Sequence, residues 1–423
     1  MTGQNTMHIN GEQARGMYRA LDYPSVDFDE FHQLELPKRL RGGVNERIIW
    51  DIKTVAAIAI TLPDGRAYSY VVRSGEVCVE SGVIDEAKTV VNIHSEEAWI
   101  DYLYEMRTRV GLLYSQAVDF SRGDFESWDA WDPAIRCMYS GREIYNPDTL
   151  EFLDRHGEAL DLHHRFSLDD DPEDMSHFLR QTGYLVVRNV FSPALILELS
   201  MELDRVRDEA VEGELTSWWT EDSAGQKYPY RLTYLNEKSP SFARLYDHSS
   251  VRKLRALSKE NVVPVPDRIE GILAVVKEYS AGSDMTGFAD LPFHNDCGMG
   301  GCHITCPSVL VSVQLDAAND SSSQLHMMAG TWGKTFHPFP NEKQQKKIPI
   351  IPLVTEPGDA TVHFGCGLHQ GPSPTGEARR RTLYIQHYNP QAMSLIKPYS
   401  GYNEIIPGYG EGAIPNIDEV QAI

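Results

Sequence analysis

Three residues in the C-terminal half of the chain have the types and spacing of a metal site. His294 and Asp296 are two apart, and in an extended segment such residues project to the same side. His369 follows in a glycine-rich stretch that can turn back to the same place. Two imidazoles and one carboxylate form the facial triad of non-haem Fe(II) oxygenases, which leaves coordination positions for a chelating cosubstrate and O₂. Alone, the short motif also fits a histidine that is hydrogen-bonded to a turn carboxylate.

A run of three arginines, Arg379-Arg380-Arg381, lies 10 to 12 residues after His369 and precedes a strand pattern. A guanidinium at this place can hold the distal carboxylate of a dicarboxylic acid in a bidentate fork, which a lysine cannot reproduce. A triple arginine by itself is usually a solvated edge. Beside the candidate metal site, one of the three is expected to be a carboxylate clamp.

The elements around these residues indicate a β-rich domain. A helix is predicted from Pro172 to Gln181, and a second begins at Ser192, where serine can cap the helix and proline follows at the first position. Beyond it, short apolar runs alternate with Gly, Pro, Asn and Ser, which is typical of a sandwich or jelly roll. Strand-length runs are 184–187, 272–276, 309–313 and 382–385.

The sequence pattern changes at residues 169–172, an acidic run that ends in a proline. This change predicts two domains, residues 1–165 and 166–423. Residues 54–80 have the alternation and turns of a small antiparallel sheet. After Ser95, a plausible N-cap, apolar residues at 99, 103, 106 and 110 predict one helix that covers that sheet. The first domain is therefore expected to be a small α+β module.

Composition narrows the function classes. The chain has 423 residues with 61 acidic and 39 basic side chains, and its net charge of −22 argues against nucleic acid as a partner. The first 30 residues lack a leader pattern and no apolar run is long enough for a membrane span, so a cytoplasmic protein is expected. The six cysteines are expected to be reduced thiols. Cys297, Cys302, Cys306 and His303 lack the spacing of usual zinc sites.

The catalytic half resembles the phytanoyl-CoA dioxygenase (PhyH) family of Fe(II)- and 2-oxoglutarate-dependent oxygenases. The resemblance covers about 220 residues, and its pieces follow one another in the family's order. These pieces are the lead-in 178–190, His294-Asn295-Asp296, the strand and turn at 315–319 and 327–332, Pro357-Gly358-Asp359, His369, and an arginine eleven residues after that histidine.

By this resemblance the second domain is a double-stranded β-helix, also described as a jelly roll or cupin-like fold. The resemblance implies iron ligation by His294, Asp296 and His369, and a cofactor set of Fe(II), 2-oxoglutarate and O₂. It implies a 2-oxoglutarate clamp at Arg380, with Arg381 as the close rival and Thr382 completing an Arg-x-Thr pair. The family's Pro-Gly-Ser-His turn is replaced here by Met-Met-Ala-Gly-Thr-Trp at 327–332. Lys277 or Tyr279 is therefore a candidate for a further cosubstrate contact, and a structural role is the alternative for both.

The N-terminal module resembles a sterol-carrier-protein-2-like (SCP2-like) domain through its Pro63-Asp64-Gly65 turn, its Gly-Glu-Val-x-Val strand and the step 91–99 into a helix. Such a domain can enclose an apolar tunnel for acyl chains or sterols. It can equally serve for dimerisation, giving a homo-oligomer, or for covering a substrate.

The expected activity is oxidation of an aliphatic C–H bond in a small apolar, lipid-like or natural-product substrate, with release of succinate and CO₂. Hydroxylation is the default outcome, and desaturation, epoxidation and ring formation stay open. Asp296 argues against halogenation, which needs a small residue at that position. The alternatives are a non-catalytic lipid carrier with a metal-free barrel, and a metal-dependent cupin isomerase or hydrolase that needs no carboxylate clamp.

Overall fold

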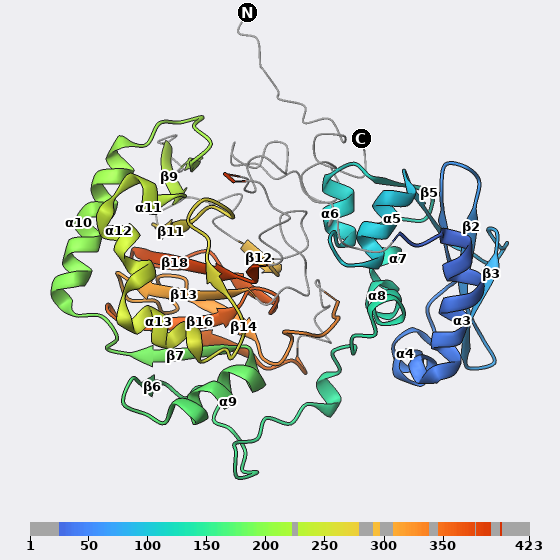
Figure 1. The fold of residues 1–423 in the computed structure, drawn as a ribbon, viewed down its shortest axis with the longest axis horizontal. Coiled ribbons are helices and arrows are strands. Elements are labelled where there is room, and N and C mark those ends of the chain that lie inside the picture. The colour runs from blue at the N-terminus through green and yellow to red at the C-terminus, as the bar shows by residue number, and fades with distance from the viewer. Residues whose placement is uncertain are drawn as a thin grey trace, which may run out of the picture.

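The computed structural model describes residues 25–221, 227–278, 291–296, 308–337, 346–376, 378–390 and 398–399 (Figure 1). Two bodies of secondary structure follow one another along the chain, and each has its own large hydrophobic core. No helix among the described residues is both long and apolar enough to cross a membrane.

The N-terminal body contains a five-stranded sheet in the order β3-β2-β1-β4-β5. Its strands are β1 (Ile58–Thr61), β2 (Ala67–Arg73), β3 (Glu76–Ser81), β4 (Thr89–Ile93) and β5 (Val118–Arg122). The predicted meander is present as β1 to β3, joined by the turns at 63–65 and 74–75. The antiparallel pairing predicted for residues 54–80 is confirmed, and β4, which lies outside that range, pairs with β1 in parallel.

Helices cover this sheet and complete its core. They are the nearly continuous stretch α2 (Phe28–Glu30), η1 (Phe31–Glu35), α3 (Leu36–Arg39), η2 (Leu40–Val44) and α4 (Asn45–Ile52), then α5 (Glu96–Leu103), α6 (Arg109–Tyr114), α7 (Phe125–Asp129), α8 (Asp132–Ser140) and the 3₁₀ turn η3 (Pro147–Thr149). Trp99, Trp128 and Trp131 are fully buried between helices and sheet.

The single helix predicted after Ser95 is wrong in length. Ser95 does cap a helix by accepting a hydrogen bond from the Ala98 amide at 3.1 Å, as expected. However, α5 ends at Leu103, Glu105 has a left-handed φ of 57°, and Thr108 caps the separate helix α6. The apolar spacing therefore continues across a break in the helix.

The C-terminal body has two sheets. The larger has the order β6-β7-β16-β13-β18-β11-β9-β8, with β10 (Val263–Pro264) beside β18. Its strands are β6 (Phe166–Ser167), β7 (Tyr184–Arg188), β8 (Ser217–Glu221), β9 (Lys227–Leu232), β11 (Ile272–Lys277), β13 (Val309–Gln314), β16 (Ala360–Phe364) and β18 (Arg380–Tyr388). The smaller has the order β12-β17-β14-β15, formed by β12 (Leu291–His294), β14 (Leu325–Met328), β15 (Ile350–Leu353) and β17 (His369–Gly371). From β11 onward the chain alternates between the sheets, except that β14 and β15 follow each other in the smaller one, so most neighbouring strands are not consecutive in the chain.

Helices pack on the outer face of the larger sheet (Figure 1). They are α9 (Pro172–Thr182), α10 (Pro193–Glu209), α11 (Leu235–Lys238), α12 (Pro240–Ala243), the 3₁₀ turn η4 (Arg244–Asp247) and α13 (Ser249–Ala256). The two helix starts predicted at Pro172 and Ser192 are confirmed, and Ser192 accepts a hydrogen bond from the Leu195 amide. The opposite, inner face of this sheet looks toward the smaller sheet and holds the candidate site.

Candidate metal and cosubstrate site

The two histidines of the predicted triad lie directly opposite each other on adjacent antiparallel strands. His294 is the last residue of β12 and His369 is the first residue of β17, and the register pairs them. Their ring centroids are 4.3 Å apart. The pairing of two short strands in the smaller sheet thus joins residues that are 75 positions apart in the chain.

Asp296 reaches the same place from the segment that follows β12. Its backbone amide donates a hydrogen bond to the Gly365 carbonyl at 2.8 Å. Gly365 permits this close approach, because a Cβ there would lie 2.3 Å from the Ser308 hydroxyl and 3.4 Å from Asp296 Oδ2. The glycine before the second histidine therefore helps to seat the carboxylate.

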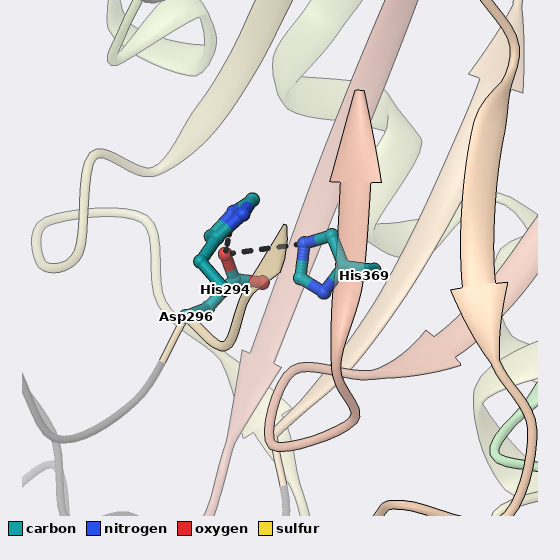
Figure 2. Close-up of side chains that lie close together, drawn as sticks. All are labelled: His294, Asp296 and His369. Atoms are coloured by element: carbon teal, nitrogen blue, oxygen red, sulfur yellow. Dashed lines mark ion pairs between the residues drawn. The ribbon is translucent and has the colours of Figure 1, made fainter. Parts of the chain in front are cut away.

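The three side chains converge on one point (Figure 2). Asp296 Oδ1 lies 3.7 Å from His294 Nε2 and 3.6 Å from His369 Nε2, and all three ligand atoms fall within 4.8 Å of one another. His369 Nδ1 donates a hydrogen bond to the Gly367 carbonyl at 2.9 Å, so in the neutral ring the Nε2 lone pair faces the carboxylate. Two acceptors that face each other fit a cation between them, and two imidazoles with one carboxylate suit Fe(II).

Arg380 points into the same interior. It is the first residue of β18 and lines a pocket together with all three triad residues. Its guanidinium donates to the Ser323 carbonyl, to Thr382 Oγ1 at 3.1 Å and to the Tyr384 hydroxyl at 2.9 Å. Among the described residues no carboxylate pairs with Arg380. Its charge is thus held by neutral acceptors inside the pocket.

A chain of hydrogen bonds across the larger sheet fixes this arginine. Thr382, which accepts from Arg380, itself donates to Gln314 Oε1 at 2.9 Å. Gln314 donates to the Ser312 hydroxyl at 2.9 Å, and that hydroxyl lies 2.6 Å from Thr361 Oγ1. The buried polar groups of β18, β13 and β16 therefore form one connected network, which restricts the guanidinium to a single orientation.

Arg381, the rival candidate, faces the other side of the sheet. It makes a bidentate pair with Asp316 at 2.8 and 2.9 Å and contacts Asp204 of α10 at 2.9 Å. Arg379 is half-exposed and lies near Asp316 and Glu278. Successive strand residues alternate between faces, so only one of two adjacent arginines can enter the pocket.

Lys277 also lines the pocket. Thr382 acts on the pocket only through the hydrogen bond that it accepts from Arg380. Lys277 Nζ donates to the carbonyls of Gly371 and Pro372, the latter at 2.7 Å. Both acceptors follow His369, so the lysine ties β11 to the strand that carries this histidine. Tyr279 and the cluster Cys297, Cys302, His303 and Cys306 lie outside the described residues.

Several pocket residues were not found from the sequence. They are Trp218, Tyr230, Arg231, Leu273, Val275, Leu310, Leu325, His363, Tyr384 and Gln386. The period-2 alternation of β18 after Arg380 would have identified Tyr384 and Gln386, because they share its face. His363 is fully buried beside His369, and its burial together with that ring lowers its pKa well below the ordinary value.

Part of the chain is similar to a known protein family. Residues 179–382, slightly less than half of the chain, match the model of the family "Phytanoyl-CoA dioxygenase (PhyH)". No curated protein sequence matches significantly.

Among solved structures, AviO1 from Streptomyces viridochromogenes Tue57 is 21% identical, with 52% of this chain and 96% of that chain covered and a TM-score of 0.42. EctD from S. alaskensis with 2-oxoglutarate and 5-hydroxyectoine is 16% identical, with coverages of 64% and 93% and a TM-score of 0.43. The epimerase SnoN in complex with Fe³⁺, alpha ketoglutarate and nogalamycin RO is 15% identical, with coverages of 55% and 96% and a TM-score of 0.39.

The family match begins and ends within a few residues of the resemblance seen in the sequence, and the candidate triad and Arg380 lie inside it. The region that is similar to this family therefore includes every residue of the candidate site, and the protein is an Fe(II)- and 2-oxoglutarate-dependent dioxygenase that uses O₂.

Proposed function

We propose that His294, Asp296 and His369 are the iron ligands of this dioxygenase. The observation that carries the proposal is the convergence of their ligand atoms within 4.8 Å. The hydrogen bond from His369 Nδ1 to Gly367 orients that ring, and the bond from the Asp296 amide to Gly365 orients the carboxylate. Both are the outer partners that metal ligands ordinarily need.

We propose Arg380 as the residue that holds the distal carboxylate of 2-oxoglutarate, with Thr382 as its positioning residue. The support is that Arg380 lines the pocket and donates to neutral acceptors, whereas Arg381 lies on the opposite side of the sheet, outside the pocket, where it pairs with Asp316 and Asp204. With its distal carboxylate held by the guanidinium fork, 2-oxoglutarate would present its other end to the triad at a fixed distance.

Iron bound there would supply activation of O₂, coupled to oxidative decarboxylation of 2-oxoglutarate to succinate and CO₂ and to oxidation of a substrate C–H bond. The pocket walls restrict which bond that is. Leu273, Val275 and Leu310 give the interior an aliphatic side near the triad. We infer that the substrate is a small molecule with an apolar portion and that hydroxylation of an aliphatic carbon is the default outcome.

We also propose that β11 to β18 form a double-stranded β-helix and that the domains are 1–165 and 166–423. The strand orders β16-β13-β18-β11 and β12-β17-β14-β15 support the first proposal, and two separate large cores support the second.

The resemblance of the first domain to SCP2-like domains stays a proposal. Its core, filled by buried tryptophan, tyrosine and phenylalanine side chains, favours a covering or supporting role over a lipid tunnel. Free thiols at Cys78, Cys137 and Cys366 are consistent with a reducing, cytoplasmic location.

The test is iron-dependent succinate formation from 2-oxoglutarate by the purified full chain and by Asp296→Ala. Mutation of a residue that only hydrogen-bonds to a metal ligand typically lowers metal affinity or activity by roughly 10- to 100-fold. Loss of the anionic ligand itself should therefore reduce turnover by more than about 100-fold. Asp64→Ala, in an exposed turn of the first domain, is the matched control and should retain full turnover. Wild-type succinate formation by Asp296→Ala would contradict the ligand assignment.

A further inference from the structure

A second arginine lines the pocket on the side away from Arg380. Arg231 lies in β9 opposite Val275 of β11, whereas Arg380 lies in β18 opposite Lys277 of the same strand. The two guanidinium groups therefore enter the pocket from opposite sides of β11, and both belong to its wall with the triad. The cosubstrate clamp proposed above uses only Arg380, which leaves Arg231 without an assigned role.

Two neighbours among the described residues hold Arg231. Its guanidinium donates to a carboxylate oxygen of Glu270, which is 2% exposed, and its Cζ lies 4.3 Å from the centroid of the Trp218 ring. Stacking on an indole and a carboxylate partner restrict a planar guanidinium to one place. Arg231 and Trp218 line the pocket and Glu270 does not, so the guanidinium is the member of the pair that meets an occupant.

The backbone that presents Glu270 is strained. Ile269, Glu270 and Gly271 have consecutive left-handed φ values of 46°, 66° and 61°. For a β-branched isoleucine this conformation is a genuine outlier, and it costs conformational free energy. Strain of this kind persists where the surroundings enforce it, and it gathers at functional sites.

Three contacts enforce this turn. The Gln386 side chain donates to the Ile269 carbonyl at 2.6 Å, and the Tyr234 amide donates to the Glu270 carbonyl at 2.7 Å. A Cβ on Gly271 would lie 2.3 Å from Asn236 Oδ1, so glycine is required there. Gln386 is itself a pocket residue, which links the strained turn to the pocket wall.

Stability does not account for the pair. A buried ion pair often contributes no more than well-packed apolar residues of similar size, because both charges lose their hydration. The strained turn adds a further cost. A charged pair that is retained at such a cost in the wall of a reaction pocket is better explained by what the arginine binds.

We propose that Arg231 binds a carboxylate of the substrate and that Glu270 and Trp218 position it. A guanidinium has donors only, so the group that it meets must be an acceptor, and a planar carboxylate matches its fork. Trp218, Tyr230, Leu273 and Leu310 would contact the carbon skeleton next to that carboxylate. The substrate class is thus a small carboxylic acid with an apolar body, and this inference rests on the proposed function.

The test uses binding of matched probes to the full chain saturated with Mn(II) and 2-oxoglutarate. Calorimetry compares 4-phenylbutanoate with 4-phenylbutanamide, and octanoate with octanamide, which differ mainly in charge. Because a charge-assisted fork is involved, the wild type should bind each acid at least about tenfold more tightly than its amide. Arg231→Gln should remove this preference and leave 2-oxoglutarate binding unchanged.

Two further variants keep the test decisive. Arg231→Gln alone leaves Glu270 buried without its partner, so the double variant Arg231→Gln/Glu270→Gln, which removes both charges, is measured beside it and should also lose the preference. Arg207→Gln is the matched control. Arg207 makes a similar pair with Glu278 at 2.7 and 2.8 Å and lies over Tyr228, but it is not part of the pocket wall.

Each other result overturns the proposal in a distinguishable way. Equal binding of acids and amides by the wild type, or an acid preference that survives in the double variant, would exclude a carboxylate subsite at Arg231. Weakened 2-oxoglutarate binding in Arg231→Gln would assign the arginine to the cosubstrate instead. Failure of the wild type to bind Mn(II) and 2-oxoglutarate, measured before any probe is added, would contradict the proposed function itself and this inference with it.

Discussion

Arg380 and Arg381 are adjacent in β18 but have opposite surroundings, and this difference gives a prediction at the scale of single residues. Arg380→Gln should raise the KM for 2-oxoglutarate roughly 10- to 100-fold, because a charge-assisted fork is lost, and should leave iron affinity nearly unchanged. Arg381→Gln should leave that KM unchanged. It should lower the free energy of unfolding by about 1.5–3 kcal/mol, because Asp316 and Asp204 lose their partner. Steady-state kinetics and urea unfolding measure both effects.

The reverse pattern, a raised KM in Arg381→Gln with normal kinetics in Arg380→Gln, would contradict the choice of arginine. Gln314→Leu refines the test, since it interrupts the network behind Thr382 without touching the pocket arginine. We expect this variant to raise the KM for 2-oxoglutarate by a smaller factor than Arg380→Gln, and kcat to change less than KM.

Residue types and spacing predicted the metal-site candidates because short motifs bring their own geometry. His294 and Asp296 are two apart, and the glycines around His369 signal a tight return of the chain. Arg231 and Glu270 carry no such signal. They are 39 positions apart, and only the pairing of β9 with β11 and the left-handed turn at 269–271 bring them together. That the three triad residues bind iron stays a prediction until it is measured.

At the scale of elements, a segment before the second domain supports the strand that carries His369. Tyr145 donates its hydroxyl to the Ala329 carbonyl at 3.0 Å, and Thr335 forms an isolated parallel bridge with Ile144. The segment 329–335 continues β14, whose Met327 pairs directly with His369. The chain around Tyr145 thus contacts the site through one intervening strand.

This connection predicts a loss of iron affinity in variants far from the ligands. Tyr145→Phe and Arg142→Gln remove side-chain bonds to Ala329 and Lys334, and we expect a several-fold weaker apparent Fe(II) affinity with an unchanged far-UV circular dichroism spectrum. Hydrogen exchange should increase in residues 325–335. Arg155→Gln, which removes exposed pairs with Asp171 and Asp174, is the control, and an equal effect there would show that the contact is not specific.

Strands and helix starts of the second domain were predicted well because their apolar runs are short and bounded by Gly, Pro or a capping serine. The helices and strands of the first domain were harder to predict from the sequence. Residues 28–52 form a nearly continuous helical stretch, yet Pro37 and the Gly42-Gly43 pair interrupt its pattern, and two π-helical turns accommodate them. The parallel pairing of β1 with β4 depends on packing between distant segments, which local alternation does not report.

At the scale of the whole molecule, the two large cores are separate, but a small apolar cluster crosses from one domain to the other. Tyr145, with Leu150 beside it, packs against Phe293, Met328, Phe336 and Leu368. Phe293 and Leu368 immediately precede the two triad histidines in the chain. His337 Nε2 also lies 3.1 Å from Asp51 Oδ1 in the first domain. The first domain therefore packs directly behind the candidate metal site, and its last segment, residues 142–165, is the linker to the second domain.

Two truncated chains separate the role of the linker from that of the folded first domain. A chain of residues 142–423 keeps Tyr145 and Leu150 in the cluster behind the histidines, whereas a chain of residues 166–423 exposes the apolar surface that they cover. We expect 142–423 to bind Fe(II) and 2-oxoglutarate nearly as well as the full chain, and 166–423 to bind iron more weakly or to aggregate. Calorimetry for both ligands and light scattering measure these outcomes. Equal iron affinity in the two truncated chains would show that the cluster does not support the site, and loss of affinity in both would place the support in the folded domain, through contacts such as that of His337 with Asp51.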